Sequence, residues 1–184
     1  LAERQGPTRT TGLKFQALVR YGTNLTTETL TLLPLHPLHV VVRMQVCQTC
    51  YSTTGQMTGN APNALVTGHG GVGIVEEVGR LVKRVKVGDQ VILATTPNCG
   101  VCQNCLSGRG DLCNTRLPAI PNATMSDNTP VYMDAPPVGP AGYSEFIVLD
   151  EDWCVPVFTR VPPAELALLS CVAGTGLGLA MCRF

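Results

Sequence analysis

The 184-residue sequence has few charged residues, and their two signs balance. There are 13 basic and 13 acidic residues, so the net charge is zero, and charged residues make up 14% of the chain where about 25% is typical. The sequence therefore lacks the excess of positive charge that is typical of proteins that bind nucleic acids or anionic membranes. A surface so poor in charge predicts that part of it is covered by a protein partner or by a further half of the protein.

Long hydrophobic runs are also absent, although 45% of the residues are hydrophobic. The apolar, uncharged stretch at residues 166–182 is shorter than the roughly 20 residues that span a bilayer and is rich in Gly, Ser and Thr. We expect a buried helix followed by a glycine-rich turn there, and no membrane span. The chain starts with Leu1 instead of Met and shows no signal peptide, which predicts a processed or trimmed product.

Helical periodicity is scarce before residue 162, whereas short strand-like segments recur. Strands are expected at residues 13–21, 30–35, 42–46, 73–78, 85–93, 143–149 and 154–157. Residues 115–140 are rich in Pro, Asn and Asp without a period, which predicts a long loop. Pro162 and Pro163 precede an apolar run and predict a helix start. Together these patterns predict a mainly β domain, a barrel or sandwich with a few short helices.

Residues 68–73 (GHGGVG) match the glycine pattern of dinucleotide-binding loops. That mechanism requires the glycines between a strand and a helix, whose N-terminus faces the pyrophosphate. A strand-like segment follows here instead, so the sequence gives no reason to place a nucleotide at this motif.

Four of the nine cysteines lie in NCGVCQNCLSGRGDLC (98–113), with the spacing C-x2-C-x2-C-x7-C. Nine cysteines cannot all form disulfides within the chain, because their number is odd. Cysteines separated by two intervening residues are better placed to bind one tetrahedral metal ion than to form a disulfide with each other. We therefore expect one zinc ion held by Cys99, Cys102, Cys105 and Cys113. Disulfides or an iron–sulfur cluster are the alternatives. Zinc thiolates imply a reducing compartment.

Five segments, in order and in spacing, resemble the zinc-dependent medium-chain alcohol dehydrogenases. They are VRMQVCQTCYS (42–52), GHGGVGIVEEVGRLVKRVKVGDQV (68–91), NCGVCQNCLSGRGDLC (98–113, here called the cysteine lobe), AGYSEFIVLDED (141–152) and LLSCVAGTGLG (168–178). The resemblance implies a GroES-like, partly open β-barrel with a four-cysteine zinc lobe. It divides the chain into a GroES-like domain (1–161, with the lobe at 98–114) and the start of a linker helix (162–184) toward a nucleotide-binding domain.

The resemblance also implies two zinc sites. The four lobe cysteines match the structural site, and Cys50, His69 and Cys171 match the three ligands of the catalytic site, whose fourth position stays open for the alcohol. Ser52 matches the hydroxyl that passes on the alcohol proton.

Other roles remain open for the residues outside the lobe. His69, between glycines, has the alternative of a turn residue, and Cys171 that of a small core residue. Tyr51 and Ser52 have the alternative of simply facing solvent. The remaining cysteines, Cys47, Cys154 and Cys182, are expected in the core, and His36 and His39 receive no role.

Three departures from the family pattern bear on activity. Gly70 stands where the family has Glu, and Thr53 stands where an acidic residue follows the relay hydroxyl. Carboxylates that orient metal ligands are typically worth about 10–100-fold in affinity or activity. The family's cofactor-binding half is not in this sequence, so this chain alone is not expected to transfer hydride.

Two functions therefore follow from the resemblance. The chain is the catalytic half of an oxidoreductase that transfers hydride between a small alcohol or aldehyde and NAD(P), or it is a non-catalytic accessory subunit of a larger assembly. Whether it acts as an enzyme stays open. A reducing interior means the cytoplasm or the mitochondrion.

Overall fold

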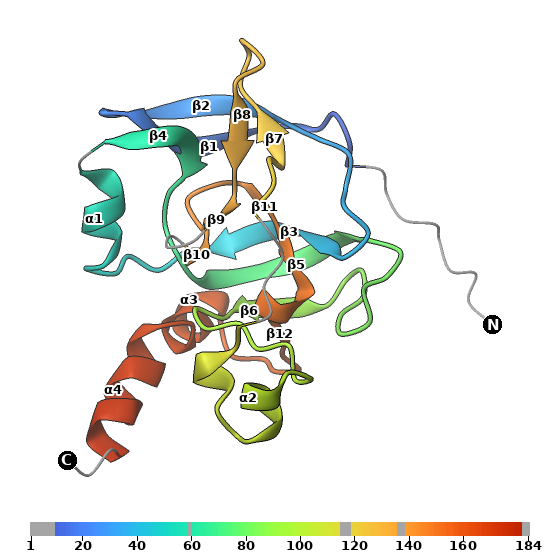
Figure 1. The fold of residues 1–184 in the computed structure, drawn as a ribbon, viewed down its shortest axis with the longest axis vertical. Helices are drawn as coiled ribbons and strands as arrows, with labels where there is room; N and C mark the ends of the chain where they lie inside the picture. The colour runs from blue at the N-terminus through green and yellow to red at the C-terminus, as the bar shows by residue number, and fades with distance from the viewer. Residues whose placement is uncertain (1–9, 59, 115–118, 136–138, 182–184) are drawn as a thin grey trace.

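The computed structural model describes residues 10–58, 60–114, 119–135 and 139–181. Its upper part in Figure 1 is a closed five-stranded barrel with the strand order β1-β2-β7-β8-β4. The strands are β1 (Lys14–Gly22), β2 (Asn24–Leu32), β7 (Ala123–Thr124), β8 (Pro130–Tyr132) and β4 (Ala61–Val66). All pair antiparallel except β4 and β8, which close the barrel in parallel.

A second, fully antiparallel sheet lies below the barrel, with the order β11-β3-β5-β6-β12. It consists of β11 (Phe146–Asp150), β3 (His39–Val46), β5 (Gly71–Val78), β6 (Gln90–Leu93) and β12 (Cys154–Pro156). A two-stranded sheet joins β9 (Asp134–Ala135) to β10 (Gly139–Pro140).

One hydrophobic core joins the barrel to the second sheet. In β1, Phe15, Ala17 and Val19 are buried in alternation, as expected when one face of a strand turns inward. Val and Leu from β2, β3 and β11 complete the same cluster. Branched side chains pack well on a pleated, buried surface, which explains why these segments form strands.

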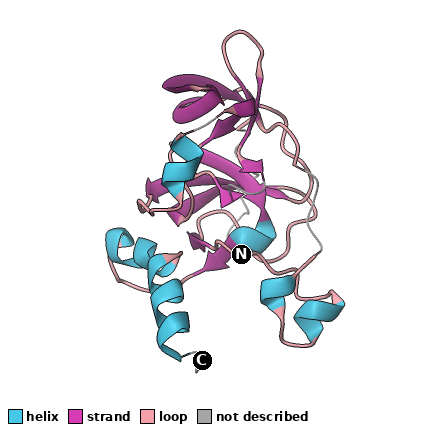
Figure 2. Ribbon diagram, turned by 60° about the vertical axis from the view of Figure 1, so that its left-hand side comes forward, coloured by secondary structure: helices cyan, strands magenta, loops and turns pink. Residues whose placement is uncertain are grey.

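The helices are short and lie outside the strands (Figure 2). They are α1 (Thr53–Met57), α2 (Gln103–Leu106), α3 (Pro163–Leu166) and α4 (Val172–Met181), with 3-10 turns η1 (Gly110–Leu112), η2 (Glu151–Trp153) and η3 (Ala167–Leu169). The cysteine lobe, which contains α2 and η1, and the C-terminal α4 project separately from the end of the molecule that carries β6 and β12 (Figures 1 and 2).

The prediction of a mainly β fold with a barrel and a cysteine lobe is confirmed, and two local predictions are wrong. Residues 115–140 are not a continuous loop, because their described part holds β7 to β10; these strands are only two or three residues long, too short to show alternation. The glycines of residues 172–181 do not form a turn. They lie inside α4, none of whose residues is buried.

No single helix in the described part of the chain is long and apolar enough to cross a membrane. Residues 163–169 and 172–181 reach that length and composition only as a pair, across a 44° bend.

Candidate metal centres and their cleft

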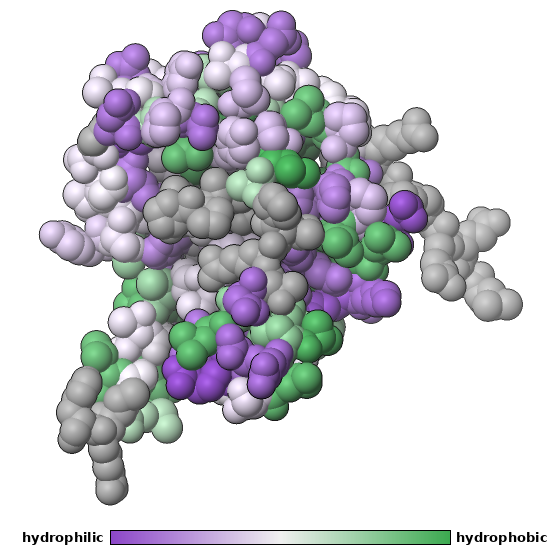
Figure 3. All heavy atoms as spheres, in the orientation of Figure 1, coloured by the Kyte–Doolittle hydropathy of each residue, from purple (hydrophilic) through white to green (hydrophobic). Residues whose placement is uncertain are grey.

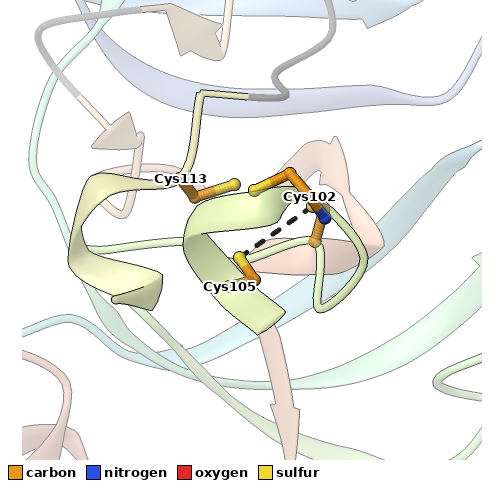
Figure 4. A group of neighbouring side chains, drawn as sticks. Cys102, Cys105 and Cys113 are labelled. Atoms are coloured by element: carbon orange, nitrogen blue, oxygen red, sulfur yellow. Dashed lines mark hydrogen bonds between the residues drawn. The ribbon is translucent and has the colours of Figure 1, made fainter. Parts of the chain in front are cut away.

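The lobe after β6 brings the thiols of Cys99, Cys102, Cys105 and Cys113 together. The four sulfur atoms all lie within 4.8 Å of one another, and the Sγ atoms of Cys99 and Cys105 are 4.0 Å apart. Figure 4 shows the side chains of Cys102, Cys105 and Cys113 turned toward a common space between α2 and the segment after η1. The lobe contributes no buried residue through α2 or η1, so it is not held together by a hydrophobic core of its own.

Backbone geometry shapes the lobe and lowers the pKa of Cys99 and Cys102, whereas burial raises the pKa of Cys105 to about 12. Gly100 has φ +73°, a left-handed conformation that suits glycine and turns the chain between the first two cysteines. The backbone N–H of Cys102 then donates to Cys99 Sγ at 3.3 Å. The backbone N–H of Cys105 lowers the pKa of the Cys102 thiol to about 6, since it stabilises the charged form. Thiolates, rather than thiols, bind metals.

A second cluster forms from three distant segments. Cys50 lies between β3 and α1, His69 between β4 and β5, and Cys171 between η3 and α4. Their ligand atoms all lie within 4.8 Å of one another, and the two sulfur atoms are 3.9 Å apart. The Ser52 hydroxyl donates to Cys50 Sγ at 3.3 Å and lies 3.3 Å from His69 Nε2. The structure therefore gathers the four residues to which the resemblance assigned a catalytic site.

The pKa shifts of Cys50 and His69 suit metal ligands, whereas the shift of Cys171 favours its protonated thiol. The Ser52 hydrogen bond lowers the pKa of the Cys50 thiol, whereas burial raises the pKa of Cys171. Burial also lowers the pKa of His69, which keeps its imidazole neutral and able to donate a lone pair.

Both clusters have donor sets and dimensions that fit zinc. With Zn–S bonds of about 2.3 Å, two sulfur ligands of a tetrahedron lie roughly 3.8 Å apart. The observed separations of 3.9 and 4.0 Å match this value. Four thiols would form a closed site, and two thiols with one imidazole would leave one position open.

The space beside Gly70 is filled by side chains from other segments. Gly70 has φ +77°, and a Cβ at this residue would overlap Ser170 Oγ. Beside it, the buried Gln48 amide donates to the carbonyl of Ala167 at 3.0 Å and accepts from the backbone N–H of Cys171 at 3.2 Å. The Gln48 amide therefore holds the backbone of Cys171.

The second departure also has a local explanation. Thr53 is buried, and its hydroxyl donates to the carbonyl of Cys50 at 2.6 Å. This contact fixes the turn that carries Cys50, but it supplies no charge.

The remaining residues of interest lie outside both clusters. Cys47 is half-buried against Gly70, and burial raises the pKa of its thiol to about 12. Cys154 is buried in the core as predicted, and Cys182 lies outside the described residues. His39, which received no role, is buried at the start of β3.

A cavity of about 950 Å³ opens above the second cluster. Ser52, His69 and Cys171 lie on its wall with Trp153. The other lining residues are Arg20, Gly55, Gln56, Thr58, Asn60, Ala61, Pro62, Leu65, Thr67, Thr95, Gly139 and Pro140. We call this cavity the cleft. Its size suits a small organic molecule.

Comparison with known sequences identifies a family for most of the chain. Residues 36–159 match the alcohol dehydrogenase GroES-like domain. The chain is 30% identical over 179 residues to the S-(hydroxymethyl)glutathione dehydrogenase of Komagataella pastoris; the match covers 92% of the chain and 47% of that protein. The chain thus spans about half the length of the curated relatives it matches.

Solved structures share the fold. A zinc-binding domain protein of the alcohol dehydrogenase type from Burkholderia ambifaria superposes with a TM-score of 0.74 at 22% identity, covering 90% of the chain and 47% of that structure. A cobalt- and zinc-bound thermostable alcohol dehydrogenase from Pyrobaculum aerophilum superposes with a TM-score of 0.67 at 23% identity, covering 91% and 48%.

Proposed function

Because the chain belongs to the family of alcohol dehydrogenase GroES-like domains, we propose that it is the alcohol-binding half of an oxidoreductase that transfers hydride between an alcohol and NAD(P). The observation that carries the proposal is the convergence of Cys50, His69 and Cys171 at the cleft, whose wall includes His69 and Cys171. Three ligands from three segments, beside an open cavity, are the arrangement a catalytic metal requires.

In this proposal Cys50, His69 and Cys171 hold a catalytic zinc, and the four lobe cysteines hold a structural zinc. A zinc ion in the cleft supplies a Lewis acid for the alcohol oxygen. The lobe would derive its folding energy from its own metal, since α2 and η1 bury no residue.

Ser52 is the proton acceptor in this scheme. Its hydroxyl is within hydrogen-bonding distance of both Cys50 and His69 and is also exposed to solvent. Ser52 would accept the proton of the bound alcohol while its own hydroxyl proton passes to solvent, so that it acts as a relay. Trp153, which is buried, forms part of the wall that keeps bulk water from the reacting carbon.

NAD(P) would be bound outside residues 1–161, by a domain to which residues 162–184 form the start of a linker helix. The proposal is supported by the surface of α4, where Leu177 and Leu179 are 61% and 62% exposed. Hydrophobic residues are visible along the projecting helix at the lower left of Figure 3. A further domain or a protein partner would cover these hydrophobic residues. The protein would work in a reducing compartment, which keeps the cysteines of both clusters from forming disulfides.

A non-catalytic accessory role is the second candidate. The observation in its favour is Gly70, which stands where the resemblance implies a carboxylate and has Ser170 and Gln48 packed beside it. A domain that kept only the lobe zinc would serve as a scaffold.

An activity assay on the full-length protein separates the two. We expect oxidation of small alcohols with NAD⁺ or NADP⁺, reduced by at least about 100-fold in Cys171→Ala and by about 10²–10⁴-fold in Ser52→Ala. Ser107→Ala, which changes an exposed hydroxyl in the lobe, is the matched control and should retain full activity. Absence of turnover with every alcohol and both nucleotides would favour the accessory role.

A further inference from the structure

Arg20 is a buried cation that the proposed reaction does not use. It lies in β1, and only 3% of its surface is exposed. Because side chains alternate along a strand, Arg20 lies on the face opposite to Val19, whose side chain packs in the core. That outer face of β1 borders the cleft, and Arg20 is among the lining residues.

The Arg20 guanidinium is only partly paired. Nη1 donates to the backbone carbonyl of Gln56 at 2.8 Å, whereas Nη2 is buried without a hydrogen-bond partner among the described residues. Arg20 takes part in none of the ion pairs found between described residues. A buried charge that lacks a counter-ion is costly, so its retention calls for an anion.

The lining of the cleft offers no such anion. Among its described residues Arg20 is the only Arg or Lys, and none is Asp or Glu. Arg20 therefore lines a cavity whose described walls are otherwise apolar or neutral, so an incoming anion would meet one cation and no repelling carboxylate.

Arg20 is linked to the candidate metal cluster through α1. The Gln56 backbone accepts from Arg20, and the Gln56 side-chain oxygen accepts from the backbone N–H of Gly68 at 2.9 Å. Gly68 precedes His69. The two hydrogen bonds of Gln56 therefore hold Arg20 and the candidate ligand His69 in fixed positions on the same cavity wall.

We propose that Arg20 is the recognition site for a carboxylate, and that the cleft takes an alcohol or aldehyde with a carboxylate at its other end. That the substrate carries a hydroxyl or aldehyde group rests on the proposed function, whereas the carboxylate site is inferred from Arg20 alone. A planar guanidinium fork matches a carboxylate through two parallel hydrogen bonds. A phosphate dianion would call for more than one cation, and the described lining supplies only one.

Equilibrium binding of pentanoate and 1-pentanol to the purified protein tests the proposal without turnover. The two probes share a chain and differ in charge at one end. Titration calorimetry should show that pentanoate binds and that its affinity falls at least about tenfold in Arg20→Gln. Arg20→Lys keeps the positive charge but loses the planar guanidinium, so its affinity for pentanoate should lie between those of the unmodified protein and Arg20→Gln. The affinity for 1-pentanol should change less than threefold in either variant.

A metal-site variant distinguishes this anion site from direct binding of the carboxylate to zinc. In Cys171→Ala, pentanoate should still bind and still depend on Arg20. If pentanoate binding is lost in Cys171→Ala but kept in Arg20→Gln, the carboxylate binds the metal and the proposal is wrong. Absence of alcohol oxidation, with intact Arg20-dependent pentanoate binding, would defeat the proposed function and leave the anion site standing.

The proposal can be tested even if Arg20→Gln does not fold. Pentanoate added to the unmodified protein should shift the side-chain ¹⁵Nη resonances of Arg20, whereas 1-pentanol should not. Unmoved Arg20 resonances at saturating pentanoate, or no pentanoate binding at all, would overturn it.

Discussion

His39 is buried at the first position of β3, where its ring lies 3.4 Å from the side-chain nitrogen of Asn122. Burial, with a smaller contribution from the nearby His36, lowers the pKa of His39 to about 4. The unfolded chain therefore binds a proton at this residue between pH 6.5 and 4, while the folded chain does not. The stabilisation is complete above pH 6.5 and is lost as the pH falls toward 4.

We expect His39 to make the free energy of unfolding fall by about 2–3 kcal/mol between pH 7 and pH 4. Urea unfolding of wild type and His39→Gln over this range measures it. Acid also weakens metal–thiolate bonds in both proteins, so the diagnostic quantity is the difference between their slopes. Parallel pH profiles for the two proteins would contradict the assignment.

Gly70 is predicted to be irreplaceable for two separable reasons. Its φ of +77° strains any other residue, and a Cβ would overlap Ser170 Oγ. Gly88 has a similar φ of +89° but open space around it. Gly88→Ala should therefore cost about 1 kcal/mol of unfolding free energy from strain alone, and Gly70→Ala about 2–4 kcal/mol from strain plus overlap. Equal costs in chemical denaturation would show that the space beside Ser170 is not filled.

At this scale the sequence indicated which residue types could bind metals, but not which residues support them. Cys50, His69 and Cys171 were found by residue type and by resemblance. Gln48 and Arg20 were missed because their roles come from contacts with segments far along the chain. Neither a polar residue in a strand, such as Arg20, nor one in a loop, such as Gln48, shows in the sequence which distant segment it contacts.

At the level of elements, α4 differs most from what the sequence predicts. Its uncharged composition suggested a buried helix and its glycines a turn, yet residues 172–181 form one exposed helix. No local pattern distinguishes a helix that packs on its own domain from one whose apolar surface is left open. By contrast, the strands of residues 14–22, 39–46 and 71–78 were predicted well because alternation or apolar β-branched runs mark them directly.

Substitutions in α4 and in α3 should therefore differ sharply. Leu179 is 62% exposed, so Leu179→Gln should change the free energy of unfolding by less than about 0.5 kcal/mol. Leu166, which is 4% exposed and packs with Val72 and Ile92, should cost about 2–4 kcal/mol when changed to Ala. Denaturant unfolding of the two variants measures both values. A large loss for Leu179→Gln would show that α4 is covered in the protein under study.

For the molecule as a whole, two metal centres predict two zinc ions per chain. Elemental analysis should give about two in wild type, about one in Cys102→Ser and about one in Cys171→Ala. The ion held by the four lobe thiols should resist chelators for longer, since the other centre has three protein ligands and an open position. Chelation should thus remove half of the zinc in a fast phase that is absent from Cys171→Ala.

Two results would contradict this prediction. One zinc ion in wild type that survives Cys171→Ala would leave the cleft without a metal. Two ions with identical release rates would show that the second centre is as closed as the first.

The two centres also differ in how far apart their ligands lie along the chain. Cys99 and Cys113 are 14 positions apart, whereas Cys50 and Cys171 are separated by 121. During translation the lobe is complete once its own loop has left the ribosome and can capture an ion there. The cleft centre gains its last ligand only near residue 171, after the strands around it have been made. In the proposed two-zinc scheme, the lobe can therefore be filled while later segments are still being made, whereas the cleft centre can be filled only after residue 171 has been made.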